Sequence, residues 1–200
     1  MTRAVTVSGR IVDLLDPQPD TICVDDVAWH LAHETRWNGQ LGMLSVAKHS
    51  IAVARIVEPI TPLTRLLALL HDGEEYLYGD VVSPAKDALA YEATTCAEGD
   101  HWVSCTGLLA AAIYTALAGR LPTTKEQEAI SVADREVAKW EAWTLGGVGW
   151  KNAIERVAPG YFDGCRGAAL PPAFPYEVSS CFGEGASTAW INEYEKLKRV

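Results

Sequence analysis

The pair His71-Asp72 is the first place in the sequence where residue types and spacing indicate chemistry. It follows the leucine-rich residues 63–70. Ionisable side chains are costly to bury unless they are paired or bind a metal. The leucine spacing predicts a helix over residues 63–77. Such a helix would place Glu75 on the same face as His71, and the Asp72 side chain would point about 100° away from that face. Because two adjacent ligands cannot complete a coordination sphere, such a site needs partners from other helices.

Two further residues could supply those partners. His49 lies in a helical pattern over residues 44–57, and Asp134 is an acid within an apolar helix pattern. With His71 and Asp72 they make a set of two imidazoles and two carboxylates. Such a mixed set suits one divalent metal ion of the first row, Co, Mn, Zn or Fe, more than Mg. The sequence therefore predicts a divalent-metal site formed by these four residues.

The hydrophobic periodicity predicts an all-α fold with a small β element at its N-terminus. Alternating β-formers over residues 4–14, interrupted by Gly9, predict a hairpin. We expect an N-cap at residues 25–26 to open the first helix, and a capping box at residues 123–126 to open a long helix that ends near Trp143. Further helices are expected over residues 44–57, 63–77, 84–98, 102–117 and 188–198, and a long irregular segment over residues 146–185.

Length and charge limit the domain count and the partners. We expect residues 1–200 to form one domain, with the metal-site core over about residues 25–145. The net charge of −9 disfavours a nucleic-acid polymer, which is usually held by a broad basic surface, and favours a small anionic ligand. No apolar run approaches the roughly 20 residues of a membrane span, and the N-terminus lacks the apolar stretch of a secretory signal. We therefore expect no membrane association and a cytoplasmic location.

Several motifs resemble the HD-domain superfamily of phosphohydrolases. They are Arg36-Trp37, SVAKHS at residues 45–50, HDGEEYLYGD at residues 71–80 with Pro84 and Lys86 after it, and Asp134. Among HD proteins the chain resembles the small bacterial 5′-deoxynucleotidases and the phage dATP triphosphohydrolases. The opening SGRIVDLLDP at residues 8–17 is also similar to phage and proteobacterial members. The resemblance covers about residues 8–140.

The resemblance implies a helical HD-domain fold and a role for each matching residue. In these roles the metal is bound by His49, His71, Asp72 and Asp134. Glu75 orients or deprotonates the attacking water, and Arg36 holds a phosphate with the assistance of Lys86. Trp37 and Asp80 contact the sugar and select deoxyribose. Turnover would depend on Asp72 and Glu75. The chain departs from the family pattern at Lys48, where an acid is common, and at Gly73-Glu74. Because neither departure falls on a ligand position, both bear on the substrate more than on catalysis.

The expected activity is hydrolysis of a small deoxynucleotide at its 5′ α-phosphate by a homo-oligomeric protein. Release of orthophosphate from a monophosphate and release of triphosphate from a dNTP both fit the pattern. Two alternatives stay open, a catalytically silent nucleotide sensor and an HD hydrolase of another phosphate substrate. Two weaker patterns indicate a solvated acidic helix face (Glu126, Glu128, Glu136 and Glu141) and a core or oligomer interface (Trp140, Trp143, Trp150 and Trp190).

Overall fold

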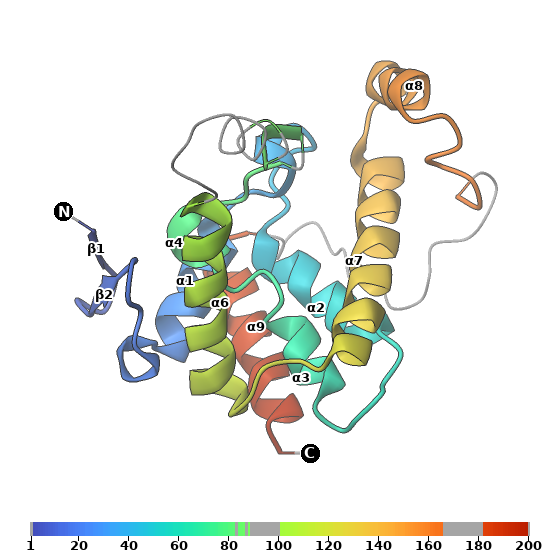
Figure 1. Ribbon diagram of the computed structural model, residues 1–200. Helices are drawn as coiled ribbons and strands as arrows, with labels where there is room; N and C mark the ends of the chain where they lie inside the picture. Colours follow the sequence, from blue (N-terminus) through green and yellow to red (C-terminus); the bar gives the residue numbers. More distant parts are fainter. Residues whose placement is uncertain (1, 83, 87, 89–100, 166–181, 200) are drawn as a thin grey trace.

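The computed structural model describes residues 2–82, 84–86, 88, 101–165 and 182–199. Within these residues helices dominate, and the strands form one two-stranded sheet near the N-terminus (Figure 1). The predicted all-α class with a small N-terminal β element is confirmed. None of the described helices combines the length and the apolar character needed to cross a membrane.

The described elements are short except for two helices. The strands β1 (Arg3–Val5) and β2 (Ile11–Asp13) pair in antiparallel fashion. The helices, with η for 3-10 helices, are η1 (Pro19–Thr21), α1 (Val24–His33), η2 (Arg36–Gly39), α2 (Val46–Ile56), α3 (Thr64–Leu69), α4 (Glu75–Tyr78), α6 (His101–Ala118), α7 (Thr124–Leu145), α8 (Val148–Val157) and α9 (Glu184–Leu197).

The main core forms where α9 packs against α1, α2 and α3. In Figure 1 the red helix α9 runs through the middle of the helical body. Its Trp190 and Tyr194 are buried, and their rings stack with centroids 5.8 Å apart. Burying a large apolar side chain stabilises a fold by about 1.5–3 kcal/mol. The helix expected over residues 188–198 is therefore confirmed, although it begins one turn earlier, and it fixes the helices that carry the site.

The expected N-terminal hairpin is confirmed, but the N-cap expected at residues 25–26 is wrong. The N-cap of α1 is Cys23. Asp26 is buried in the first turn of α1, where it accepts hydrogen bonds from the hydroxyls of Thr6 (2.6 Å) and Ser8 (2.7 Å). Because these partners precede Asp26 by 20 and 18 residues and belong to the hairpin, the acid attaches the hairpin to the helix and does not cap it.

The helix expected over residues 63–77 is interrupted where His71 and Asp72 lie. The chain leaves α3 after Leu69, forms turns over residues 70–74, and becomes helical again in α4. The prediction of one continuous helix is therefore wrong. A turn presents His71 and Asp72, and the shared helix face that we expected for His71 and Glu75 does not exist.

Close packing of the backbone explains this turn. A Cβ atom added at Gly73 would lie 2.9 Å from the carbonyl oxygen of Leu70 and 3.0 Å from Cγ2 of Ile113 in α6. Real Cβ atoms do not approach other atoms so closely without displacing them. Glycine therefore allows the turn to lie directly on α6.

The remaining predictions divide by region. The helices expected over residues 44–57 and 102–117 correspond to α2 and α6, and the capping box of α7 is present with the Thr123 and Glu126 side chains bonding each other's backbone. The prediction of an irregular segment over residues 146–185 is wrong for Val148–Val157, which form α8. Residues 166–181, and most of the helix expected over residues 84–98, lie outside the described residues.

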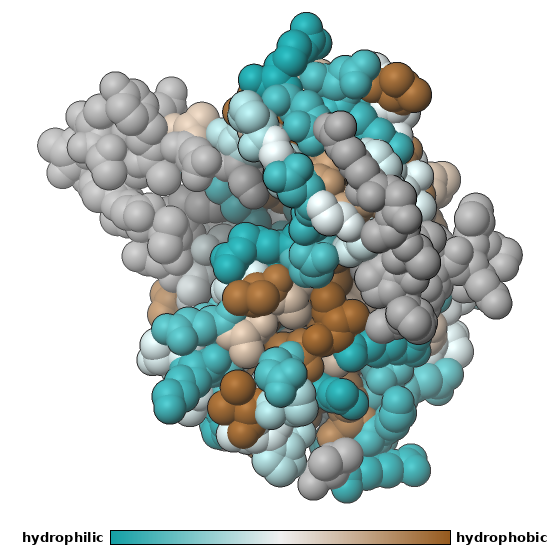
Figure 2. All heavy atoms as spheres, turned by 90° about the vertical axis from the view of Figure 1, so that its right-hand side faces the viewer, coloured by the Kyte–Doolittle hydropathy of each residue, from teal (hydrophilic) through white to brown (hydrophobic). Residues whose placement is uncertain are grey.

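A second, smaller cluster of buried side chains joins α7 and α8 to η2. Trp140, Phe162 and Leu41 are buried in it, and Trp150 and Ile154 of α8 pack against them. The predicted core role of the tryptophans is thus confirmed for Trp140 as well as for Trp190 of the main core. Figure 2 views the molecule from the α7 side and shows apolar residues gathered among mainly hydrophilic ones. For Trp143 and Trp150, a role in an oligomer interface stays a prediction.

Candidate metal centre

Three segments bring the predicted ligands together. His49 lies near the start of α2, where Ser45 caps the helix by accepting a hydrogen bond from the backbone N–H of Lys48. The turn after α3 presents His71 and Asp72, and Asp134 projects from the middle of α7. Because α2 packs against both α3 and α7, these residues converge although they are far apart in sequence.

The four side chains meet through one atom each. Nε2 of His49 lies 3.0 Å from Oδ1 of Asp134 and 3.6 Å from Oδ2 of Asp72. Nε2 of His71 lies 3.2 Å from Oδ2 of Asp72 and 3.8 Å from Oδ1 of Asp134. One ligand atom from each of His49, His71 and Asp134 lies within 4.8 Å of the other two. These three residues could hold a metal ion, and Asp72 stands beside both imidazoles.

The hydrogen bonding of the two imidazoles fits a metal. Nδ1 of His49 contacts Oε1 of Glu141 at 2.8 Å, and Nδ1 of His71 contacts the carbonyl oxygen of Ala68 at 2.8 Å. Both Nε2 atoms are buried, neither makes a hydrogen bond of standard geometry with a described residue, and both face the carboxylates of Asp72 and Asp134. Metal-binding histidines show this arrangement, with one nitrogen held by a protein acceptor and the other directed at the ion. The residues present therefore fit the ion that the sequence implies.

The electrostatics of the cluster favour positive charge at its centre. Burial alone would raise the pKa of Asp72, but the His71 imidazole and the Arg36 guanidinium outweigh burial and hold that pKa well below its usual range. The pKa of Asp134 is lowered in the same way, by His49 and His71 against burial. Burial would lower the pKa of each imidazole, but the surrounding carboxylates raise both. A cation between these carboxylates would relieve their mutual repulsion.

Arg36 is a cationic side chain that touches this cluster. Its guanidinium lies 3.4 Å from Asp72, 3.6 Å from Asp80, and 3.9 Å from both Asp134 and Glu141. Burial would lower the pKa of Arg36, but these acids raise it above its already high value. The arginine is therefore charged at any pH at which the protein is folded.

The backbone beside Arg36 is strained. Trp37 and Asn38 have φ angles of 58° and 50°, in the left-handed region that residues with a side chain seldom adopt. Asp80 holds this conformation by accepting a hydrogen bond from the backbone N–H of Trp37 at 2.8 Å. Strain of this kind costs about 1–3 kcal/mol and concentrates at functional sites.

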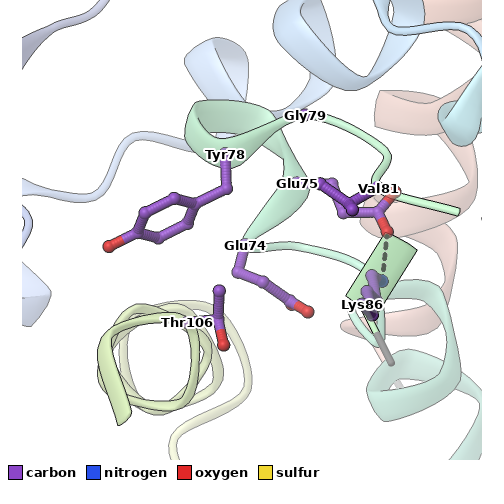
Figure 3. A pocket seen from close by; sticks show the side chains of 7 residues that line it. All are labelled: Glu74, Glu75, Tyr78, Gly79, Val81, Lys86 and Thr106. Carbon is purple, nitrogen blue, oxygen red and sulfur yellow. Dashed lines mark hydrogen bonds and ion pairs between the residues drawn. The ribbon is translucent and has the colours of Figure 1, made fainter. Parts of the chain in front are cut away.

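A pocket of about 210 Å³ is lined by Glu74, by residues of α4 and of the segment after it, and by Thr106 of α6. Figure 3 shows the Lys86 and Glu75 side chains meeting at its edge, with Glu74 extending into the space between Thr106 and Lys86. Lys86 Nζ lies 3.3 Å from Oε1 of Glu75, while Oε2 of Glu75 is buried without a hydrogen-bond partner among the described residues. Burial and the charges of Asp72 and Asp80 raise the pKa of Glu75 well above its usual range. Burial also raises the pKa of Glu74 to about 7.

Comparison with known proteins gives one informative match. No family model matches the chain. An uncharacterised protein of Rhodobacter capsulatus is 37% identical over 150 residues, which cover 70% of this chain and 71% of that protein. The chain belongs to the same family as this protein. Family membership alone therefore leaves the activity to be inferred from the site.

Glu141 is a buried residue of the site that was not predicted from the sequence. The interpretation of Glu126, Glu128, Glu136 and Glu141 as a solvated acidic face is wrong for Glu126 and Glu141, which are fully buried. The carboxylate of Glu141 contacts His49, and it accepts a hydrogen bond from Nε1 of Trp37 at 3.2 Å. A signal was available, because Glu141 follows Asp134 by two helical turns and lies on the same face of α7.

Proposed function

We propose that the protein is a divalent-metal-dependent phosphohydrolase that hydrolyses a deoxynucleotide at its 5′ α-phosphorus, releasing orthophosphate from a monophosphate or triphosphate from a dNTP. The observation that carries this proposal is the convergence of two buried imidazole nitrogens with the carboxylates of Asp72 and Asp134, next to a buried arginine. A metal alone could be structural, whereas a metal beside a charged arginine and a buried acid suits a phosphate ester. The resemblance to HD-domain phosphohydrolases supports the same conclusion.

The metal ion would be held by His49, His71, Asp72 and Asp134. When bound, such an ion lowers the pKa of a water molecule and offsets the charge of a phosphate. Co, Mn and Zn suit the two imidazoles better than Mg does.

Arg36 would bind the phosphate. A guanidinium presents parallel N–H donors that match two phosphate oxygens, and its charge persists at all relevant pH values. The side chain already lies within 4 Å of two candidate metal ligands, Asp72 and Asp134. A phosphate oxygen at the cluster would therefore meet the guanidinium without a large movement of the chain.

Glu75 would accept the proton of the attacking water. Its carboxylate is buried, Oε1 is held by Lys86, and Oε2 has no hydrogen-bond partner among the described residues. A raised pKa brings a carboxylate closer to the pH at which it exchanges protons efficiently. Lys86, which is half exposed, would keep the carboxylate oriented while the proton moves.

Trp37 and Asp80 would form the wall against which the sugar packs. The Trp37 ring meets Trp150 edge to face, with centroids 5.7 Å apart, so its position is set from one side by α8. Asp80 fixes the Trp37 backbone, as described above. Because a rigid aromatic wall leaves little room for an added hydroxyl, we expect preference for deoxyribose over ribose.

A screen of metals against nucleotides tests the proposal. The purified protein would be assayed with Mn, Co, Zn, Mg or EDTA against deoxy- and ribonucleoside mono- and triphosphates, with chromatographic identification of products. Orthophosphate from several dNMPs identifies a 5′-nucleotidase, and triphosphate from a dNTP identifies a triphosphohydrolase. Metal-dependent nucleotide binding without turnover would contradict the proposal and favour the silent sensor. Hydrolysis of a cyclic nucleotide instead would favour the other HD substrates.

The variant Glu75→Gln separates binding from chemistry. Because the amide cannot accept a proton, we expect kcat to fall by about 10²–10⁴-fold while nucleotide affinity is retained. Isothermal titration with the nucleotide and single-turnover kinetics measure the two effects. The matched control is Glu136→Gln, an acid of α7 that lies outside the site and is about half exposed. Unchanged kcat in Glu75→Gln would remove Glu75 from the mechanism.

A further inference from the structure

Glu141 is a buried carboxylate with two different donors on its two oxygens. Oε1 lies 2.8 Å from Nδ1 of His49, and Oε2 accepts the hydrogen bond from Nε1 of Trp37 at 3.2 Å. Nε of Arg36 lies 3.9 Å from the same Oε2. The side chain is fully buried. One residue thus touches a candidate metal ligand and the segment that we expect to bind the nucleotide.

The chemistry of the two donors restricts what can occupy this position. An indole Nε1–H donates and never accepts. An imidazole that binds a metal through Nε2 must carry its proton on Nδ1, which then donates as well. The group between Trp37 and His49 must therefore accept on both sides. A carboxylate does so, whereas an amide of the same size has one accepting oxygen and one donating nitrogen.

We propose that Glu141 is a positioning residue that fixes His49 in its metal-binding tautomer and at the same time anchors Trp37, so that it couples the metal centre to the nucleotide-binding segment. This inference rests on the metal centre of the proposed function. Because Glu141 makes both contacts with one rigid group, a change on either side alters the hydrogen bond available to the other.

The variant Glu141→Gln tests whether Glu141 fixes the tautomer of His49. If its oxygen stays on Trp37, its amide N–H faces Nδ1 of His49 and moves the imidazole proton to Nε2, which then cannot bind an ion. We expect Co²⁺ affinity to fall by about 10–100-fold, the usual effect of removing an acceptor behind a metal-binding histidine. Calorimetric titration and the visible spectrum of bound Co²⁺ report this without any assay of activity, after far-UV circular dichroism has confirmed folding.

The variant Glu136→Gln is the matched control. Glu136 lies on the same helix and also accepts a hydrogen bond from a tryptophan, Nε1 of Trp140 at 2.9 Å. It touches no residue of the metal centre in the described structure. We expect Co²⁺ affinity to be unchanged, so that a general effect of replacing an acid in α7 is excluded.

A rescue experiment distinguishes positioning from simple structural support. The double variant Glu141→Gln with Trp37→Phe removes the indole N–H, and the single variant Trp37→Phe serves as its reference. The glutamine oxygen is then free to accept from His49, so we expect the double variant to recover most of the Co²⁺ affinity lost in Glu141→Gln. Two independent packing losses would instead add, because each would weaken the site separately.

The outcomes separate this inference from the proposed function. Full Co²⁺ affinity in Glu141→Gln, or no recovery in the double variant, would overturn the positioning role and leave the phosphohydrolase proposal standing. Failure of the unaltered protein to bind Co²⁺ would overturn both. Loss in Glu141→Gln with recovery in the double variant is the result expected.

Discussion

Glu126 and Glu141 lie near opposite ends of α7 and are equally buried, but their surroundings differ. The oxygens of Glu126 accept hydrogen bonds at 2.8 Å from both terminal nitrogens of Arg120, and one accepts from the backbone N–H of Thr123 at 2.9 Å. Glu141 bonds to His49, whose other ring nitrogen faces the carboxylates of Asp72 and Asp134. A polar cluster whose groups all bond to one another stabilises the fold. A cluster in which buried ring nitrogens converge with carboxylates is arranged for a metal ion.

The largest effect is expected when a candidate metal ligand near Glu141 is removed. In His71→Ala we expect Co²⁺ affinity to fall by more than the roughly 100-fold that outer residues cause, and turnover to be lost. In the unaltered protein, Co²⁺ at 100 times its Kd should raise the free energy of unfolding by about 2.7 kcal/mol. In His71→Ala that stabilisation should vanish. Chemical denaturation with Co²⁺ or EDTA measures both, and equal stabilisation of the two proteins would contradict the assignment of His71.

A smaller effect is expected from a change in the turn over residues 70–74, which carries His71 and Asp72. In Gly73→Ala the added methyl group would press on Leu70 and Ile113, and overpacking of this kind costs about 1–3 kcal/mol. Because the turn also carries His71 and Asp72, Co²⁺ affinity should fall with stability. The control is Gly107→Ala in α6, where nothing lies within 4 Å and alanine should stabilise the helix by about 0.5–1 kcal/mol. Unaltered stability in Gly73→Ala would show that the turn can move.

The contribution of Glu126 to the stability of the fold should depend on pH and not on metal binding. The Arg120 guanidinium, which bonds both oxygens, holds the pKa of Glu126 well below its ordinary value of 4.5 despite burial. Since the folded pKa is the lower one, the charged carboxylate stabilises the fold above the unfolded pKa, and this contribution is lost as the pH falls through the folded pKa. We expect Glu126→Gln to lower the free energy of unfolding at neutral pH by about 1–3 kcal/mol, with unchanged Co²⁺ affinity.

Urea denaturation at several pH values checks this prediction. The difference in stability between the unaltered protein and Glu126→Gln should be full at neutral pH and should shrink below about pH 4.5. Glu128→Gln, an exposed position on the same helix, should change stability by less than about 0.5 kcal/mol at any pH. A difference that stays constant into the acid range would show that Glu126 acts through packing instead.

The sequence allowed correct prediction of the features that depend on local patterns. The capping box of α7 and the apolar periodicity of α2 and α6 involve neighbours within a few residues, so local spacing sufficed. The grouping of His49, His71 and Asp134 was predictable because their residue types are costly to bury without a partner, and the resemblance to HD proteins supplied the same set. The metal identity and the activity stay predictions.

The features that were predicted wrongly depend on distant contacts. The break after α3 requires the approach of Gly73 to α6, which no pattern in residues 63–77 reveals. The burial of Glu126 and Glu141 depends on Arg120, Thr61 and His49, and His49 lies 92 residues from Glu141. The helix α8 was hidden because glycines flank its short apolar pattern, and it gains its packing from η2 and α7. In each case the deciding interaction is tertiary.

The position of α9 late in the chain has a consequence for synthesis on the ribosome. Trp190 and Tyr194 are at the centre of the core between α1, α2 and α3, yet they follow these helices by more than a hundred residues of translation. Until α9 leaves the exit tunnel, the apolar surface that these helices bury against α9 is uncovered and is open to chaperones or to aggregation. We therefore expect folding, and with it assembly of the metal cluster, to be completed only after translation has passed α9.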